Sequence, residues 1–212
     1  MIVDCVADCH GYKPILEGGD LLIIAGDCTA RNAAHQWLEF FIWLDDQKYE
    51  KIVLIAGNHD GYLQRMTSLS EILADSNISY LQDSSTTFRG YKIYGSPWTP
   101  TFKKWHFMKD RGPEIAERWA LIPEDTDILV THGPPAGVLD LVERFDRMEH
   151  IGCKDLFSRV INLKLTLHVF GHIHGSYGQM THPPLRYVNC SLVNEQYEHV
   201  NKPIRVELPN KD

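Results

Sequence analysis

The chain has 212 residues, 43% of them hydrophobic, and a formal net charge of −7. This length and composition are typical of one large α/β domain, so we expect residues 1–212 to form a single domain. An acidic chain disfavours an extended nucleic-acid groove, which needs a basic surface, and no apolar run approaches the roughly 18 residues that cross a membrane. Five scattered cysteines without a C-x-x-C pair predict reduced thiols and a cytoplasmic location.

Short runs of β-branched and apolar residues alternate with helical patterns along the chain. In chain order we expect strands over 3–7 and 21–25, a helix over 32–49, a strand over 52–56, a helix over 62–75, a hairpin over 86–94 that turns at Arg89-Gly90, a helix over 114–121, a strand over 128–130, a helix over 155–163, a strand over 165–170, and two or more antiparallel strands within 185–208. This alternation predicts a layered α/β domain in which a second sheet packs beside the first. Asp4, a charge inside the first strand, is a departure that the sequence does not explain.

Residues suited to metal binding follow each of the five apolar strands. The motifs are Asp8-x-His10, Gly26-Asp27, Gly57-Asn58-His59-Asp60, Thr131-His132-Gly133 and Gly171-His172-x-His174. Because parallel strands end at one edge of a sheet, and ligands bind beyond that edge, we expect the motifs to meet in one pocket. Carboxylate, amide and imidazole groups together predict a hydrolytic centre with two metal ions.

The spacing inside the motifs also favours metal binding. Asp8 and His10 are two residues apart, as are His172 and His174, so on an extended segment each pair points to one side. Asp27 follows a glycine, which allows a tight turn, and its two oxygens can bridge two ions. Mn²⁺, Fe, Ni²⁺ and Zn²⁺ all suit these ligands, and we expect two divalent ions per chain, with Mn²⁺ effective in vitro.

Taken in order, the five motifs resemble the calcineurin-like metallophosphoesterase superfamily. The resemblance covers nearly the whole chain. The blocks Tyr94 to Pro100 and Val188 to Ser191 are most similar to its metallophosphoesterase-domain (MPPED) subgroup. The resemblance implies a four-layer α-β-β-α sandwich, in which two mixed sheets are flanked by helices.

By position, the resemblance also implies roles for the motif residues. One metal would be bound by Asp8, His10, Asp27 and His174, and the other by Asp27, Asn58, His132 and His172. His59 would be the catalytic histidine beside the metals, and Asp60 would orient it. Asn58, His59 and Trp98 are the expected substrate contacts. The aromatic residues from Trp98 to Phe107 could form a base-stacking lid, although we favour packing.

The expected reaction is hydrolysis of a small phosphodiester such as a cyclic nucleotide. The two ions would activate a water for in-line attack on phosphorus, and His59 would protonate the leaving oxygen. A phosphomonoesterase is the alternative, but the stretch from Gly26 to Arg31 departs from the G-D-x-x-D-R-G motif of protein phosphatases. A nuclease and a non-catalytic scaffold are less favoured, because the chain is acidic and its ligand set is complete. The physiological substrate and the oligomeric state are left open.

Overall fold

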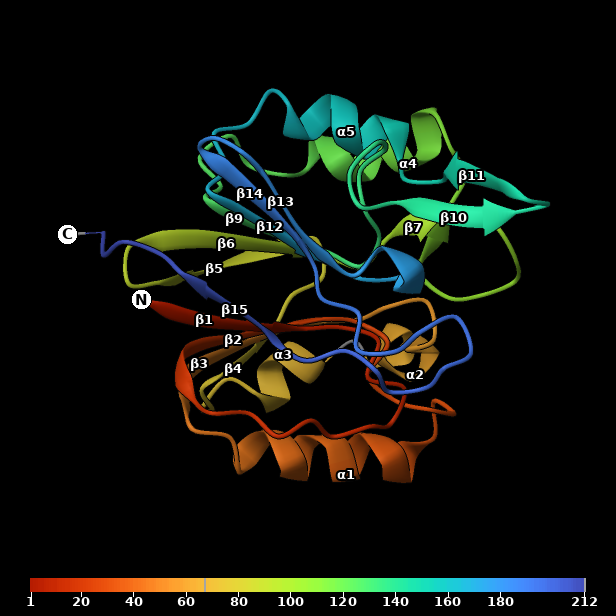
Figure 1. Ribbon diagram of the computed structural model, residues 1–212. Coiled ribbons are helices and arrows are strands. Elements are labelled where there is room, and N and C mark those ends of the chain that lie inside the picture. The colour runs from red at the N-terminus through yellow and green to blue at the C-terminus, as the bar shows by residue number, and fades with distance from the viewer. Residues whose placement is uncertain (67, 212) are drawn as a thin grey trace.

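The computed structural model describes residues 1–66 and 68–211. Over these residues the chain forms two β-sheets that lie face to face, with helices on both outer sides (Figure 1). One sheet has five strands in the order β15-β1-β2-β3-β4, and the other has six in the order β13-β14-β12-β9-β6-β5. The four-layer sandwich of mixed sheets implied by the sequence resemblance is therefore confirmed.

The five-stranded sheet is mainly parallel. Its parallel strands are β1 (Ile2–Val6), β2 (Gly19–Ala25), β3 (Tyr49–Ile55) and β4 (Ile78–Tyr80), and β15 (Ile204–Glu207) pairs antiparallel with β1. Helix α1 (Ala34–Asp45) covers the outer face and buries Trp37, Phe40 and Leu44 against it (Figure 1). The short helices α2 (Gly61–Arg65) and α3 (Leu69–Ile72) lie on the same side.

The six-stranded sheet has a parallel centre and antiparallel edges. Its strands are β5 (Ser84–Phe88), β6 (Tyr91–Ser96), β9 (Ile128–Thr131), β12 (Leu167–Phe170), β13 (Gly178–His182) and β14 (Leu185–Asn189). Helices α4 (Pro113–Ala120) and α5 (Lys154–Val160) cover its outer face (Figure 1). Shorter elements extend beyond the strand ends: β7 (Thr99–Pro100), β8 (Met108–Lys109), β10 (Leu141–Arg144), β11 (Arg147–His150) and the 3₁₀ helix η1 (His174–Ser176).

Strand side chains alternate between two hydrophobic cores. In β1, for example, Val3 and Cys5 face the core between the sheets, whereas Val6 faces the outer core beneath the helices. Central strands are thus buried on both faces, which explains why they read as continuous apolar runs rather than alternating ones. The two cores hold the strand ends, and the loops that follow them, in fixed positions.

The five predicted strands are present, and the hairpin turns at Arg89-Gly90 with positive φ at both residues. The predicted helix over 32–49 is too long, because β3 already begins at Tyr49. The predicted helix over 62–75 is wrong as a continuous element. Backbone angles at Met66 leave the helical region, so α2 and α3 are separate, and Thr67 lies outside the described residues. In the tail, β14 pairs antiparallel with β13 and β15 with β1, rather than with each other.

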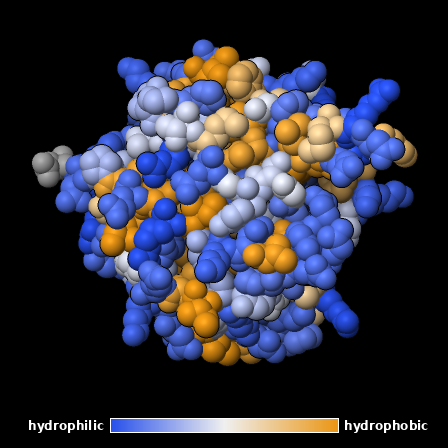
Figure 2. Space-filling model, in the orientation of Figure 1, coloured by the Kyte–Doolittle hydropathy of each residue, from blue (hydrophilic) through white to orange (hydrophobic). Residues whose placement is uncertain are grey.

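The surface in Figure 2 carries small hydrophobic groups separated by hydrophilic residues. Ile15 and Phe145 are among the most exposed large apolar side chains. Within the described ranges, none of the helices combines the length and apolar character needed to cross a bilayer.

The structure explains the charge at Asp4. Asp4 lies opposite Arg205 in the β1–β15 register, and the Nε and Nη2 atoms of Arg205 each donate to its carboxylate at 2.8 Å. The Tyr49 hydroxyl donates to the same carboxylate. A buried carboxylate is stable when such donors replace water, so Asp4 ties the first strand to the last.

We expect Arg205→Met to lower the free energy of unfolding by about 1–3 kcal/mol, because it leaves the buried Asp4 carboxylate without its charged partner. Urea denaturation measures this change. Arg89→Met is the matched control, since Arg89 pairs with the more exposed Asp20 and Glu50 and should cost only about 0–1 kcal/mol. Equal effects of the two variants would contradict the role given to Asp4.

Candidate metal centre

The predicted motifs meet where the two sheets end. Asp8, Asp27 and Asn58 follow β1, β2 and β3 of the five-stranded sheet, and His132 and His172 follow β9 and β12 of the six-stranded sheet. The motif residues thus meet beyond the carboxyl ends of parallel strands, as predicted. These strands, however, belong to two facing sheets. The site therefore lies at the shared edge of both layers.

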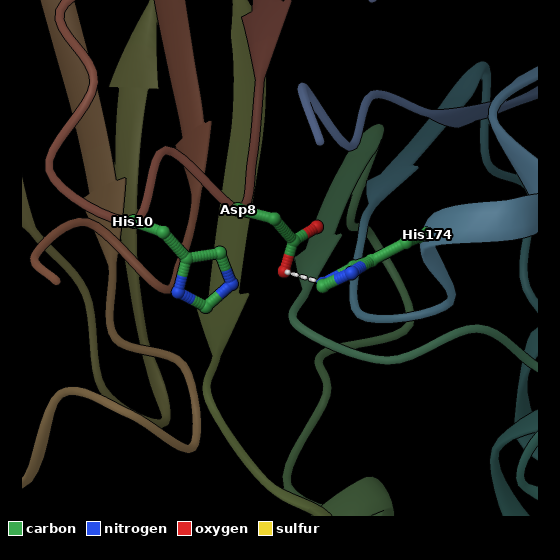
Figure 3. A group of neighbouring side chains, drawn as sticks. All are labelled: Asp8, His10 and His174. Atoms are coloured by element: carbon green, nitrogen blue, oxygen red, sulfur yellow. Dashed lines mark ion pairs between the residues drawn. The ribbon is translucent and has the colours of Figure 1, made fainter. Parts of the chain in front are cut away.

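One group of potential ligands contains Asp8, His10 and His174 (Figure 3). Their ligand atoms all lie within 4.8 Å of one another, and His174 Nε2 is 3.6 Å from Asp8 Oδ1. The other Asp8 oxygen accepts the backbone N–H of His172 at 2.8 Å. Asp8 thus offers Oδ1 to the site and uses Oδ2 to hold the loop that carries the last two histidines.

Asp27 lies at the centre of the site. Its Oδ2 is 3.4 Å from His132 Nε2, 3.8 Å from His10 Nε2 and 4.0 Å from His59 Nε2. It belongs to two further groups with ligand spacing, one with His10 and His59 and one with Asp8 and His132. A carboxylate in this position can serve two ions at once.

The remaining predicted ligands surround His132. Asn58 Oδ1 is 3.0 Å from His132 Nε2, and the ring centroids of His132 and His172 are 4.9 Å apart. Asp27, Asn58, His59, His172 and His174 all line one pocket of about 880 Å³.

The hydrogen bonds of these residues fit cations. Asp8 Oδ1 and His10 Nε2 are buried, and neither has a hydrogen-bond partner in the described chain. His132 Nδ1 donates to the Ala25 carbonyl at 2.8 Å, which leaves the Nε2 lone pair facing the Asn58 oxygen. Two acceptors that face each other in a buried site are satisfied by a cation between them.

The electrostatics agree with this fit. Burial lowers the pKa of His172 to about 3, which keeps the ring neutral as a metal ligand requires. Burial also opposes the charged form of His132, but the neighbouring Asp27 carboxylate raises the pKa of His132 to about 9. Without a metal the ring therefore holds a proton on Nε2 as well, and a cation would bind by displacing that proton. For the same reason the pKa of Asp27 lies well below its usual range, despite burial. The site thus concentrates negative charge that positive charge must balance.

Several candidate ligands have strained backbones. Asp8, His10, Asp27 and His172 have φ values between 42° and 69°, a region that non-glycine residues seldom adopt. Clustered strain of this kind is typical of functional sites. A Cβ atom on Gly57 would lie 2.2 Å from Asp27 Oδ1, and one on Gly171 would lie 2.2 Å from Asp8 Oδ2. The motif glycines therefore allow the loops to approach the carboxylates.

The contacts of Asp60 differ from its predicted role. Its carboxylate accepts the backbone N–H groups of Gly57 at 2.8 Å and Cys28 at 3.1 Å, so it holds two loops together. Burial raises the pKa of Asp60 to about 8. The His59 ring instead lies against Trp105, with centroids 4.2 Å apart and planes tilted by 32°. These contacts give no support to the role of Asp60 in orienting His59, which stays a prediction.

The aromatic segment divides into two parts. Trp98 and Phe107 are buried and in mutual contact, and Trp98 Nε1 donates to Asp83 at 2.7 Å. Packing therefore accounts for both residues, and the substrate contact of Trp98 stays a prediction that the pocket lining does not support. Phe102 and Trp105 are instead exposed and line the pocket.

Tyr197, which no sequence pattern singles out, lies beside the histidines. Its ring centroid is 4.7 Å from that of His10 and 5.3 Å from that of His174. The Asn194 carbonyl accepts both the Tyr197 N–H and His174 Nδ1, so one turn places the tyrosine and orients a candidate ligand. No motif surrounds Tyr197, and its proximity follows from the fold alone.

Comparison with known proteins defines the class of this chain. The family model described as calcineurin-like phosphoesterase matches residues 3–176, and the chain belongs to that metallophosphoesterase family. Among curated relatives, metallophosphoesterase domain-containing protein 1 of Homo sapiens and that of Mus musculus are each 40% identical to it, over 97% of this chain and 70% of theirs. The crystal structure of TT1561 of Thermus thermophilus shares the fold, with a TM-score of 0.59 and 14% identity over 89% of this chain and 88% of its own. Together, the family and the Asp/His clusters indicate a binuclear metal site in a phosphoesterase.

Elemental analysis of the metal-loaded protein should approach two equivalents per chain. Asp27→Ala should lower the occupancy of both sites, because Asp27 belongs to two of the ligand groups. His59→Ala is the matched control and should retain both ions. Near-full occupancy in Asp27→Ala would exclude a bridging role for this carboxylate.

Proposed function

We propose that this chain is a phosphodiesterase that acts on a small diester such as a cyclic nucleotide. The central position of Asp27, within 4.0 Å of three histidine nitrogens, is the observation that carries the proposal. We further propose that residues 1–212 act as one metallophosphoesterase domain with Mn²⁺ in vitro. Five free, buried cysteines support a reducing, cytoplasmic location.

In this proposal the two metal positions share Asp27. The first uses Asp8, His10, Asp27 and His174, and the second uses Asp27, Asn58, His132 and His172. Divalent cations held there would activate water and offset the charge of a phosphate ester. The chain's own residues then bind the ester, orient it and supply the proton.

His59 is the proposed proton donor to the leaving oxygen. The position of His59 supports this role. Its ring lines the pocket, and its backbone N–H donates to Asp27 at 2.8 Å. Burial lowers the pKa of His59 in the free protein, whereas an anionic ester beside the ring favours the protonated form. The Trp105 ring lies against the His59 ring, and His59 Nε2 is 4.0 Å from Asp27 Oδ2. Asn58 and His59 are the proposed contacts to the phosphoryl oxygens.

The pocket has room for a diester. A volume of about 880 Å³ is near the upper end of the range for small-molecule sites. Such a pocket accommodates organic groups on both ester oxygens, whereas a small monoester fills little of it.

We expect His59→Ala to keep both metals and to lose activity by roughly 10²–10⁴ when the leaving group is poor. With p-nitrophenolate, a good leaving group that needs little protonation, the loss should be smaller. Trp105→Leu should show the same dependence on the leaving group in weaker form. A loss of metal together with activity in His59→Ala would make His59 a ligand instead.

The diester assignment is tested by kcat/KM for bis(p-nitrophenyl) phosphate against p-nitrophenyl phosphate, at one pH and with one metal. We expect the diester to be preferred. A tenfold preference for the monoester, about 1.4 kcal/mol in transition-state binding, would make the protein a phosphomonoesterase and leave the metal centre intact.

A further inference from the structure

One part of the lining of the metal-site pocket has no role in metal binding. This part comes from the loop that ends at Gly112, from the β10–β11 hairpin, and from the segment between His150 and Asp155. It includes Gly152 and Cys153, which the proposed reaction does not use. A pocket of this size binds a ligand much larger than one phosphate group.

Arg111 is the best-positioned cation in this lining. Its Nη1 donates to the Gly152 carbonyl at 2.8 Å and its Nη2 donates to the Ile151 carbonyl at 2.6 Å. Both acceptors are neutral, and no carboxylate oxygen of the described residues lies within 4.0 Å of an Arg111 nitrogen. A guanidinium has five N–H donors, so three remain for a ligand. Its charge is therefore held in place without being neutralised.

The carbonyls that hold Arg111 belong to a rigid segment. Asp140 is fully buried, and its Oδ2 accepts the Gly152 N–H at 2.9 Å. The Asp140 carbonyl accepts the Ile151 N–H at 3.1 Å, and Asp140 Oδ1 is 2.6 Å from His150 Nδ1. A Cβ on Gly152 would lie 2.5 Å from the Pro135 carbonyl oxygen, so a larger residue does not fit there. Asp140 thus fixes the segment on which Arg111 rests.

This segment is also attached to the loop of a candidate metal ligand. The Cys153 N–H donates to the Pro134 carbonyl at 3.0 Å, and the Ala136 N–H donates to the Cys153 carbonyl at 3.0 Å. Pro134 is two residues past His132. Arg111 and the metal centre are therefore joined by continuous hydrogen-bonded backbone, which fixes their separation.

The neighbouring charges favour an anion. Arg144 and Lys154 are exposed in the same lining. Apart from the candidate metal ligands, the acids of this lining are Asp155, whose Oδ2 accepts the Gly112 N–H at 3.1 Å, and Glu195, whose Oε1 accepts the Gly175 N–H at 3.0 Å. Oxyanions match the forked geometry of arginine, and a donor fixed in advance loses little entropy on binding.

We propose that Arg111 forms a second anion subsite, which binds a phosphate or carboxylate on the substrate away from the ester that is cleaved. The inference rests on the proposed phosphodiesterase function and narrows the substrate class to diesters with an additional anionic group. His150 lies beside the subsite, with Nδ1 directed to Asp140 and Nε2 available to the same ligand.

Two matched diesters test the subsite: p-nitrophenyl phenyl phosphate and p-nitrophenyl 4-carboxyphenyl phosphate. Both release p-nitrophenol, and they differ in one distant carboxylate. We expect the native protein to prefer the carboxylated diester at least tenfold in kcat/KM, mainly through KM. Arg111→Gln should bring this ratio close to one, Arg111→Lys should keep part of it, and Lys164→Gln, which removes a charge outside the pocket lining, should leave it unchanged.

A binding measurement without metal supplies a second readout. Isothermal titration of the metal-free protein with inorganic pyrophosphate should give at least fivefold weaker binding for Arg111→Gln than for Lys164→Gln. If neither diester is hydrolysed by the metal-loaded protein, the phosphodiesterase proposal fails. If both are hydrolysed but the ratio is near one in the native protein, or is unchanged in a folded Arg111→Gln variant, Arg111 serves only to hold the loop and the subsite proposal is wrong.

Discussion

The structure depends on placing two almost fully buried carboxylates side by side at the base of the pocket. Asp8 and Asp27 are 0% and 2% exposed, and each faces histidine nitrogens across less than 4 Å. Ionised groups at such depth are costly unless opposite charge lies close by. The fold accepts this cost at one edge, where backbone N–H groups hold one oxygen of each carboxylate and leave the other for cations.

The two sheets divide this task between them. The five-stranded sheet supplies the carboxylates and the amide, whereas the six-stranded sheet supplies His132 and His172. The loops after β1, β2 and β12 turn through strained backbone conformations that a flexible scaffold would relax. Cores on both faces of each sheet keep the strand ends in register, so the strain persists and the ligands stay preorganised. The packing of the cores thus keeps the metal-binding side chains in position at the carboxyl ends of the strands.

Much of the site was predictable because its signals are local. A buried strand followed at once by Asp27 or His132 places the side chain at a strand end, whatever the rest of the chain does. The expectations that gained no support concern residues whose contacts are decided at long range. The sequence does not distinguish Trp98 from Trp105. In the structure the Trp98 indole donates a hydrogen bond to Asp83 and lies outside the pocket lining, whereas Trp105 lies in it. Asp60 follows His59 directly, but its carboxylate faces the loop of Cys28.

The pairing of β1 with β15 has a consequence for synthesis of the chain. Asp4 and Arg205 are 201 residues apart in sequence, yet they are neighbours in the sheet. While the chain emerges from the ribosome, β1 can pair with β2 early, but its other edge stays open until β15 arrives. Open strand edges invite pairing with other chains, and contacts of such long range form slowly. The edge of β1 is therefore exposed from the time this strand is made until β15, which carries Arg205, pairs with it.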